Sequence, residues 1–167
     1  EGVDVGIVVY FNGSDFVRVQ DNRVALRPEA LIGLSLQANH TYLVERNTVI
    51  APGAFPDGIV LWATDASTGI NGSTVRHNRI VMDGSIFGAF SLIGSGRGNY
   101  IGQNRIEGSA AYALGLIADF VPGAIASENA FSGNNIASFQ ALDSPVYGSA
   151  ADVFFDFNTE HNVLTGH

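Results

Sequence analysis

The sequence contains neither cysteine nor lysine. Without cysteine, disulfide bonds, thiolate metal sites and a cysteine nucleophile are all excluded. The eight basic residues are all arginine, and sixteen acidic residues bring the net charge to −8. Because binding of nucleic acid calls for a clustered basic surface, we expect no nucleic-acid partner.

Charged residues and long apolar runs are also scarce. Only 14% of the residues are charged, against roughly 25% in an average soluble domain. The longest apolar tract, Ala110 to Ala126, is interrupted by Asp119 and Pro122, so it predicts no membrane span. The chain instead has 46% hydrophobic residues and 20 glycines, which favours buried strands joined by tight turns. Its length suits a single domain, residues 1–167.

A short pattern recurs six times along the chain. It consists of an apolar residue, two mostly polar residues, an asparagine, any residue and a large apolar residue. The copies are Val19–Val24, Val44–Val49, Val75–Ile80, Ile101–Ile106, Ala126–Phe131 and Thr159–Leu164. Their asparagines are separated by 25, 31, 26, 25 and 33 residues. This spacing indicates a repeating unit that accepts insertions.

Short segments rich in β-forming residues lie between the copies, and most of them begin with glycine. They are Gly6–Tyr10, Gly33–Leu36, Gly58–Trp62, Gly88–Leu92, Gly115–Ile117 and Asp152–Phe155. No apolar spacing typical of a long helix persists over three turns. A unit of two or three strands cannot cover its own apolar face, so we expect about six units to stack as a parallel β-solenoid. The six asparagines would then form one hydrogen-bonded ladder at the left-handed bends between strands.

These turns, strand starts and irregular spacings resemble those of right-handed parallel β-helix proteins, the pectate-lyase-like superfamily. The resemblance extends from Gly6 to Gly166. It implies an all-β solenoid, an extracellular or periplasmic location, and a face on the first strands that holds polysaccharide. It implies no single activity, because the superfamily includes lyases, hydrolases, epimerases, phage tailspikes and non-catalytic scaffolds. The alternative fold is a β-sandwich whose turns happen to contain asparagine.

Charged residues beside the asparagines test the stacking. If the asparagines align, Asp21 stacks on Arg46 and Glu45 stacks on Arg76, so opposite charges meet. The same register stacks two like charges, Arg79 and Arg105. We expect that contact to be neutralised by nearby Glu107 or by a bound anion.

The first-strand face offers a row for sugar binding. Alternation directs Ile7, Val9, Leu34, Leu36, Ile59 and Leu61 inward. Tyr10, Gln37 and Trp62 then point outward from three successive coils, where aromatic rings suit sugar rings lying flat. The alternative is that Trp62 only shields a strand edge under the loop from Ala63 to Ser73.

Loops after the first strands carry a candidate catalytic group: Asp65, Arg97 and Asp119. Two carboxylates around an arginine could act as acid, base and charge stabiliser. Asp152 and Asp156, which flank the last first-type strand, form an alternative pair for ligand binding. For all five residues the other interpretation is a solvated surface. The Asp-Asp, Gly-His-Gly and Arg-Ile-Lys signatures of polygalacturonase-like enzymes and the Asp-Pro-His signature of alginate epimerases are absent.

No metal or cofactor is expected. The four histidines, His40, His77, His161 and His167, occupy positions that cannot converge on one ion. Neither end of the sequence carries an amphipathic helix that would cap a solenoid, which suggests either a fragment of a longer β-helix or self-association through uncapped ends.

Three functions remain open from the sequence. The first is a non-catalytic or degenerate scaffold that binds an extended polysaccharide along Tyr10, Gln37 and Trp62. The second is a polysaccharide lyase or glycoside hydrolase that uses Asp65, Arg97 and Asp119. The third is a structural spacer or adhesin stalk, which a flat outward face without a cleft would favour.

Overall fold

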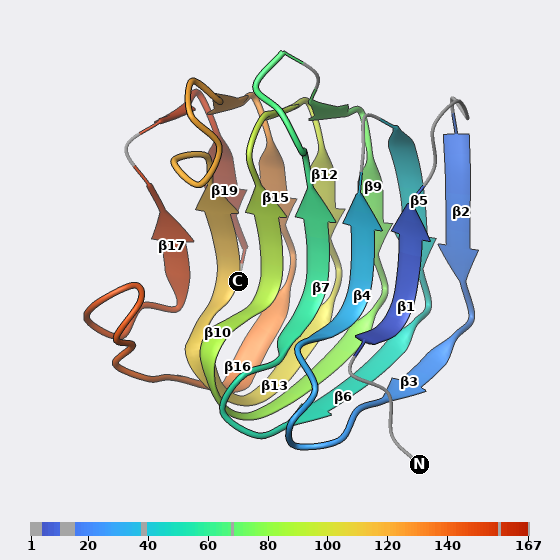
Figure 1. The fold of residues 1–167 in the computed structure, drawn as a ribbon, viewed down its shortest axis with the longest axis vertical. Helices are drawn as coiled ribbons and strands as arrows, with labels where there is room; N and C mark the ends of the chain where they lie inside the picture. Colours follow the sequence, from blue (N-terminus) through green and yellow to red (C-terminus); the bar gives the residue numbers. More distant parts are fainter. Residues whose placement is uncertain (1–4, 11–15, 38–39, 68, 157, 167) are drawn as a thin grey trace.

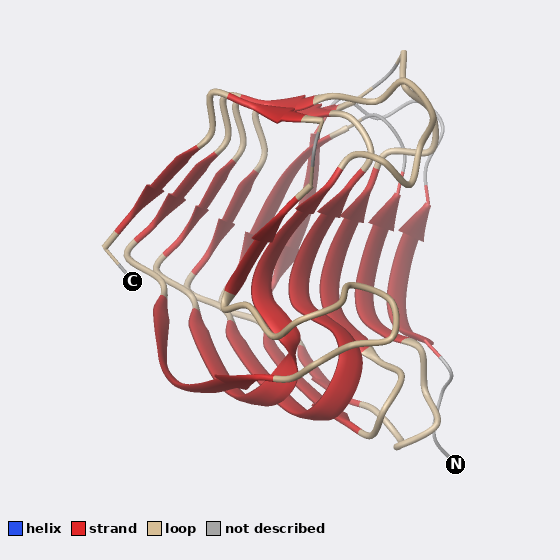
Figure 2. Ribbon diagram, turned by 90° about the vertical axis from the view of Figure 1, so that its left-hand side faces the viewer, coloured by secondary structure: helices blue, strands red, loops and turns tan. Residues whose placement is uncertain are grey.

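A computed structural model describes residues 5–10, 16–37, 40–67, 69–156 and 158–166, with the side chains of Val5 and Tyr10 left out. Nineteen strands and no helix are found in these residues. The strands pair in parallel from coil to coil and form a β-solenoid of about five turns (Figures 1 and 2). The all-β solenoid prediction is therefore confirmed, with about five turns in place of six. No helix in the described residues is long and apolar enough to span a membrane.

Three walls enclose the core. The first wall contains β1 (Val5–Tyr10), β4 (Ile32–Gln37), β7 (Asp57–Trp62), the ends of β10 (Arg79–Ile93) and β13 (Arg105–Ile117), and β17 (Val153–Phe155). The second wall contains β2 (Phe16–Gln20), β5 (Thr41–Glu45), β9 (Thr74–Arg76), β12 (Tyr100–Gly102), β15 (Ala130–Ser132) and β19 (Val163–Thr165).

The third wall continues into the first. It contains β3 (Arg23–Ala25), β6 (Thr48–Pro52), the beginnings of β10 and β13, and β16 (Asn135–Ala141). Because β10 and β13 run around the bend without a break, the two walls form one nine-stranded sheet. A narrow sheet links the first wall to the second. It contains β8 (Ile70–Asn71), β11 (Gly96–Arg97), β14 (Ala126–Ser127) and β18 (Thr159–Glu160).

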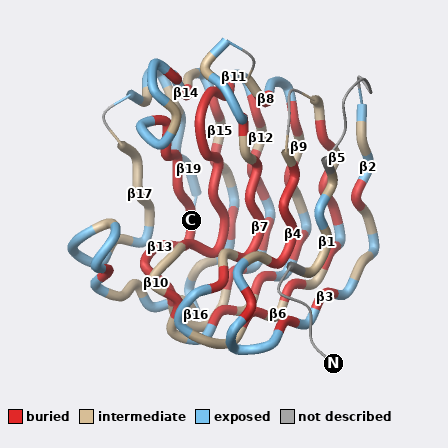
Figure 3. The backbone as a smooth tube through the Cα atoms, viewed as in Figure 1, coloured by how far each residue is buried: buried red, intermediate tan, exposed pale blue. Residues whose placement is uncertain are grey.

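The core follows the alternation of the strands. Leu34, Leu36, Ile59 and Leu61 are fully buried, as predicted. Ile7 and Val9 of the first coil are partly buried against the same cluster. Figure 3 shows buried residues running along the strands of the walls, while exposed residues gather in the loops.

One asparagine ladder stands at the corner between the second and third walls. In this ladder, the side-chain Nδ2 of each asparagine donates a hydrogen bond to the Oδ1 of the asparagine in the next coil. The N–O distance is 2.9 Å between Asn22 and Asn47 and 3.0 Å at each of the next three steps. The column contains Asn22, Asn47, Asn78, Asn104 and Asn134. The first four members were predicted to align, and this is confirmed.

The last two repeats belong to a different corner, so the prediction of a single ladder is wrong. Asn129 and Asn162 form a second column with Asn99, between the narrow sheet and the second wall. Ser73 occupies the first step of this column, where its backbone N–H donates to Asn99 Oδ1 at 2.8 Å. Three successive coils of the described structure therefore contain two corners of the same kind, at Ser73 and Asn78, Asn99 and Asn104, and Asn129 and Asn134.

The left-handed residue at these corners is the one before the asparagine. Asp21, Arg46, His77, Gln103, Glu128 and His161 all have φ between 51° and 58°. Glycine takes the same role at Gly72, Gly98 and Gly133, with φ between 62° and 65°. The prediction that the asparagine itself adopts the left-handed conformation is therefore wrong, because the residue before it does so. The asparagine amide instead satisfies two backbone groups of the preceding coil: Asn78 Nδ2 donates to Val44 O at 2.9 Å, and Asn78 Oδ1 accepts from the Asn47 N–H at 2.9 Å.

The predicted ion pairs are present. Arg46 bonds to Asp21 at 2.8 Å, and Arg76 bonds to Glu45 at 2.8 Å. Both guanidinium groups lower the pKa of the Glu45 carboxyl group, Arg76 more strongly.

The like-charged pair is also neutralised as expected. Arg79 and Arg105 lie opposite each other, and Glu107 bonds to both of them. The register predicted from the sequence therefore holds on both sides of this corner.

Candidate functional site

The outward row of the first wall changes character along the solenoid. Gln37 lies opposite Trp62, Trp62 opposite Ile93, and Ile93 opposite Ile117. Gln37 and Trp62 are partly exposed, whereas Ile93 and Ile117 are 7% and 2% exposed. Tyr10 precedes Gln37 in register, but its side chain lies outside the described part of the structure. The row therefore ends in residues that another part of the chain covers.

The segment that covers these residues joins β16 to β17 and comprises residues 142–152, which we call the covering segment. Ser144 and Gly148 exchange backbone hydrogen bonds of 2.8 Å, which closes a turn. The Ser144 hydroxyl donates to the carbonyl of Ile86 at 2.7 Å, which holds the turn against β10. Tyr147 then packs against the buried cluster on the outward face, and Trp62 contacts the same cluster. Trp62 therefore packs partly against this buried cluster, while the rest of its side chain is exposed.

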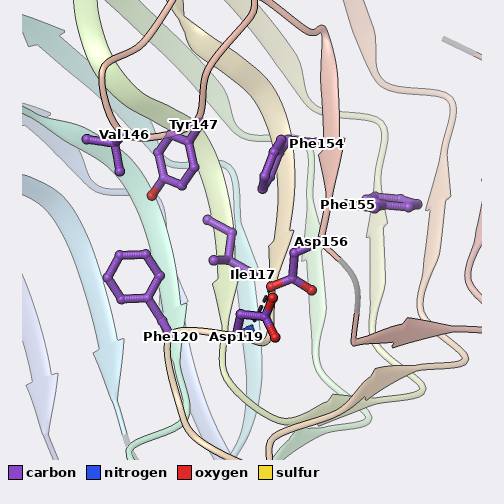
Figure 4. Close-up of a pocket in the computed structure, with 8 residues that line it drawn as sticks. All are labelled: Ile117, Asp119, Phe120, Val146, Tyr147, Phe154, Phe155 and Asp156. Carbon is purple, nitrogen blue, oxygen red and sulfur yellow. Dashed lines mark hydrogen bonds between the residues drawn. The ribbon is translucent and has the colours of Figure 1, made fainter.

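A pocket of about 250 Å³ opens between this segment and the end of the first wall (Figure 4). Its lining is mostly apolar and includes four aromatic side chains, with two carboxyl groups at one end. The lining residues are Ile117, Asp119, Phe120, Val146, Tyr147, Phe154, Phe155 and Asp156. Ile117 continues the outward row, so the pocket lies at the end of the face on which sugar binding was predicted.

Two of the aromatic rings are held by their neighbours. Phe154 stacks on Tyr112 with 5.8 Å between ring centroids, and Tyr147 lies 5.0 Å from Tyr112 in an edge arrangement. Phe120 is 57% exposed and Val146 is 45% exposed. Figure 4 shows Phe120 and Tyr147 on the same side of the pocket, with the Tyr147 hydroxyl toward Phe120, so a ligand placed there could contact both aromatic residues.

The carboxyl groups of Asp119 and Asp156 meet at the polar end of the pocket. The backbone N–H of Asp119 donates to Asp156 Oδ2 at 2.7 Å, and Asn158 donates from its side chain to Asp119 and from its backbone to Asp156. Desolvation raises the pKa of Asp156, and the charge of Asp119 adds to this, while the backbone N–H groups oppose it. The pair can therefore offer hydrogen-bond acceptors to a ligand, and the raised pKa of Asp156 lets it retain its proton to higher pH than a solvated aspartate.

The structure brings together only some of the predicted site residues. Asp119 and Asp156 meet, although they were assigned to different groups. Arg97 instead pairs with Glu128 through bonds of 2.9 and 2.7 Å. Asp65 accepts bonds from the backbone and hydroxyl of Ser67 at 2.9 and 2.7 Å.

Asp152 is exposed, and its backbone carbonyl accepts from Ala113 at 3.0 Å. Phe120, Val146 and Tyr147 were not predicted as site residues. The aromatic residues clustered at Tyr147, Phe154 and Phe155 were the available signal for them.

A second polar group missed by the sequence lies under the covering segment. Asp57 Oδ1 accepts from the backbone N–H of Gly88 at 3.2 Å and from the Ser91 hydroxyl at 3.1 Å. The Ser91 hydroxyl also lies 2.9 Å from the Tyr112 hydroxyl. Desolvation raises the pKa of Asp57 from 3.8 to about 7, although both hydrogen bonds lower it. Asp57 therefore changes charge near neutral pH.

No cluster of three or more His, Asp or Glu side chains able to hold a metal ion occurs among the described residues. The pocket thus offers aromatic faces and paired carboxyl groups as its binding elements. Comparisons of the chain with protein-family models, curated proteins and solved structures find no match.

Proposed function

We propose that this protein binds a neutral glycan, with one sugar ring in the pocket between Phe120 and Tyr147. The pocket, which combines aromatic walls with a carboxyl pair, carries the proposal. Aromatic rings cover the apolar faces of a sugar, and carboxylates accept hydrogen bonds from its hydroxyl groups. A volume of about 250 Å³ is below the roughly 300–1,000 Å³ of pockets for drug-sized ligands. The pocket therefore suits one ring rather than a long segment.

The remainder of the glycan would extend along the outward row. Because Ile117 and Ile93 are covered, the glycan would pass over the covering segment to reach the partly exposed Trp62, two coils or about 10 Å from Ile117, and then Gln37. This direction accords with the sequence resemblance to pectate-lyase-like β-helices, which hold polysaccharide on the corresponding face and work outside the cell or in the periplasm. The chain would act as a scaffold in that setting.

A neutral ligand is favoured by charge. Asp119 and Asp156 lie together at the polar end of the pocket, and the whole chain carries a net charge of −8. A uronate carboxylate placed beside them would meet like charge. The proposal therefore excludes acidic polysaccharides as the preferred ligands.

The test is binding of neutral and acidic oligosaccharides, first on a glycan array and then by titration calorimetry. Phe120→Ala is expected to weaken binding of the neutral ligand about tenfold, equivalent to about 1.4 kcal/mol. Phe55 supplies a matched control, because it is 53% exposed compared with 57% for Phe120 but does not line the pocket. Phe55→Ala should leave the affinity unchanged. Binding to no glycan, or equal losses in both variants, would contradict the proposal and leave a structural spacer as the better description.

Trp62→Ala separates the row from the pocket. We expect this variant to bind a monosaccharide as the wild type does but to bind a longer oligosaccharide several-fold more weakly. Loss of monosaccharide binding would instead place the primary site at Trp62.

Glycoside hydrolysis is a second function, favoured by the raised pKa of Asp156 beside Asp119. A protonated Asp156 can donate its proton to the leaving oxygen while the Asp119 carboxylate accepts a proton from the water that attacks the sugar carbon. A lyase would require a uronate, which the carboxyl pair repels. Release of reducing ends that stops in Asp156→Asn, with binding retained, would establish hydrolysis. Binding without turnover in the wild type would exclude it for the ligand tested.

A further inference from the structure

Asn158 lies beside the pocket and joins its two acidic residues. It stands between β17 and β18, and its backbone carbonyl accepts from the N–H of Ala126 at 3.1 Å. Its backbone N–H donates to Asp156 Oδ1 at 3.2 Å, and its side-chain Nδ2 donates to Asp119 Oδ1. Asn158 is therefore held by the strand pairing of one coil and reaches an acidic residue of the coil before, 39 residues earlier.

The two carboxyl groups of the pocket, which Figure 4 shows side by side, differ in how they are engaged. Both oxygens of Asp156 accept from backbone N–H groups, Oδ1 from Asn158 and Oδ2 from Asp119 at 2.7 Å. Asp156 therefore cannot turn toward a ligand without losing these bonds. Asp119 accepts at Oδ1, and among the described residues no group donates to its Oδ2. Asp119 Oδ2 is thus the open acceptor at the polar end of the pocket.

Asp119 gains from being held because it lies on a loop. It follows the end of β13 and is exposed, whereas the last residues of that strand are buried. An exposed aspartate samples several rotamers, and fixing one of them on binding lowers the affinity. The bond from Asn158 holds one carboxyl oxygen in place before a ligand arrives. The other oxygen is then left for the pocket that Asp119 lines.

We propose that Asn158 is a positioning residue that holds Asp119 so that its Oδ2 accepts a hydrogen bond from one hydroxyl group of the sugar. Asn158 is not among the residues that line the pocket, so it acts through Asp119. This inference rests on the proposed function of the pocket. It assigns recognition of the hydroxyl group to Asp119, whereas Asp156 ties together the backbones of the two loops.

This assignment makes the site selective for one hydroxyl group of the ligand. A carboxylate oxygen only accepts hydrogen bonds, so the sugar must present a free hydroxyl group to Asp119. A deoxy sugar that lacks this group leaves Asp119 Oδ2 without a partner. Loss of a hydrogen bond to a charged group lowers affinity about tenfold or more. Removal of hydroxyl groups that do not meet Asp119 should have smaller effects.

The test is a double-mutant cycle, measured by titration calorimetry with the neutral glycan that binds the wild type best. Asp119→Ala should weaken binding about tenfold or more. Asn158→Ala should weaken it several-fold, because the carboxyl group must then be ordered on binding. The double variant should bind as weakly as Asp119→Ala alone, since Asn158 acts only through Asp119.

Asn135→Ala is the matched control. Asn135 is also exposed, but its side chain bonds only to the backbone N–H of Ala137 on the third wall. This variant should keep the wild-type affinity. Urea unfolding of each variant checks that the affinities are measured on folded protein.

Monodeoxy forms of the bound sugar give a readout that a merely structural role of Asn158 would not change. In the wild type, one of them should bind about tenfold more weakly than the parent sugar. This difference should shrink in Asn158→Ala, vanish in Asp119→Ala and persist in Asn135→Ala.

The outcomes separate this inference from the proposed function. Equal affinities of the wild type and Asn158→Ala, or additive losses in the double variant, would overturn the role of Asn158 while glycan binding stands. A deoxy effect that is unchanged in Asp119→Ala would overturn the assignment of Asp119 as the acceptor. If the wild type binds no glycan, the proposed function fails, and the role of Asn158 in it fails as well.

Discussion

The corners of the solenoid and the outward face of its first wall are built from the same stacked coils, yet they differ in how far one coil repeats the next. At the corner of the first ladder, Asn47, Asn78 and Asn104 occupy equivalent positions. Along the outward row, the equivalent positions hold Trp62 and then Ile93. At each bend the backbone has N–H and C=O groups without a partner in a strand, and the repeated asparagine amides form hydrogen bonds to them. A position that changes from coil to coil is free of that demand and can serve binding.

The largest difference should appear when a ladder amide is removed. Asn78 Oδ1 accepts from the backbone and side chain of Asn47, and its Nδ2 donates to Asn104 and Val44. In Asn78→Ala these buried partners lose their bonds, at about 1–3 kcal/mol each for groups left unsatisfied. We expect urea unfolding to show a loss of about 4 kcal/mol in total. Asn22→Ala, at the partly exposed first step, should cost about 1 kcal/mol. Equal losses of unfolding free energy in the two variants would mean that the buried hydrogen bonds of the ladder do not stabilise the corner.

The outward face should show its own signature in the pH dependence of stability. The pKa of Asp57 is raised from 3.8 to about 7, so the folded chain holds a proton that the unfolded chain releases. Stability is therefore highest at low pH and falls as pH rises between these values. From pH 5 to pH 7.5 the loss due to Asp57 should be about 2.5 kcal/mol.

Asp57→Asn isolates this contribution, since Asp156 shifts in the same direction. Glu45 shifts the other way, because its pKa is lowered by Arg76 and Arg46. Its stabilising effect is lost only as the pH falls below the usual range of a glutamate, outside this window. Urea unfolding at several pH values that gives parallel curves for wild type and Asp57→Asn would refute the raised pKa.

Glycine substitutions compare the two regions by steric contact. Gly88→Ala should cost about 2 kcal/mol, because the new Cβ meets the Tyr112 ring and overpacking must be relieved. Gly98→Ala at a corner has nothing within 4 Å of the new Cβ. Only its φ of 65° opposes alanine, at about 1 kcal/mol. Thermal unfolding should show a larger loss of stability in Gly88→Ala than in Gly98→Ala. The reverse order would contradict the close packing of Gly88 against the Tyr112 ring.

The smallest effect concerns the strained corner residues. His77 has φ of 55°, a conformation that costs about 1–2 kcal/mol for a residue with a Cβ. Glycine removes this cost but loses about 0.5–1 kcal/mol through chain entropy. His77→Gly should therefore stabilise the protein by about 0.5 kcal/mol in thermal unfolding. Val75→Ala, in the buried core next to the corner, is the control and should destabilise it.

Much of the fold could be predicted because stacking makes equivalent residues recur. The positions of Asn22 to Asn104 and the pairing of Asp21 with Arg46 follow directly from the repeat. The error at Asn129 has the same origin. It lies 25 residues after Asn104 and so matches the shortest repeat, whereas the true partner is Asn134, 30 residues on. The sequence Phe131 to Ile136 fits the pattern equally well and was the signal that this coil has two corners.

The candidate site could be predicted only in part, because it depends on segments that do not repeat. Asp119 and Asp156 were predicted as candidate site residues because they are acidic and lie beside strands. Their contact depends on how the chain after Ile117 approaches β17, which the sequence pattern does not show. Tyr147 belongs to a segment with no counterpart in the other coils, so no spacing could place it over the first wall. Asp57 is an ordinary strand residue in the sequence, and the desolvation that raises its pKa appears only in the folded structure.

The most direct test of sugar binding at the non-repeating face is a crystal structure of the protein soaked with the neutral oligosaccharide that binds best in solution. We expect a sugar ring between Phe120 and Tyr147, with hydroxyl groups within hydrogen-bonding distance of Asp119 or Asp156 and the next residues directed toward Trp62. A ligand bound on another wall, or an empty pocket at saturating ligand, would contradict the division between structural corners and a binding face.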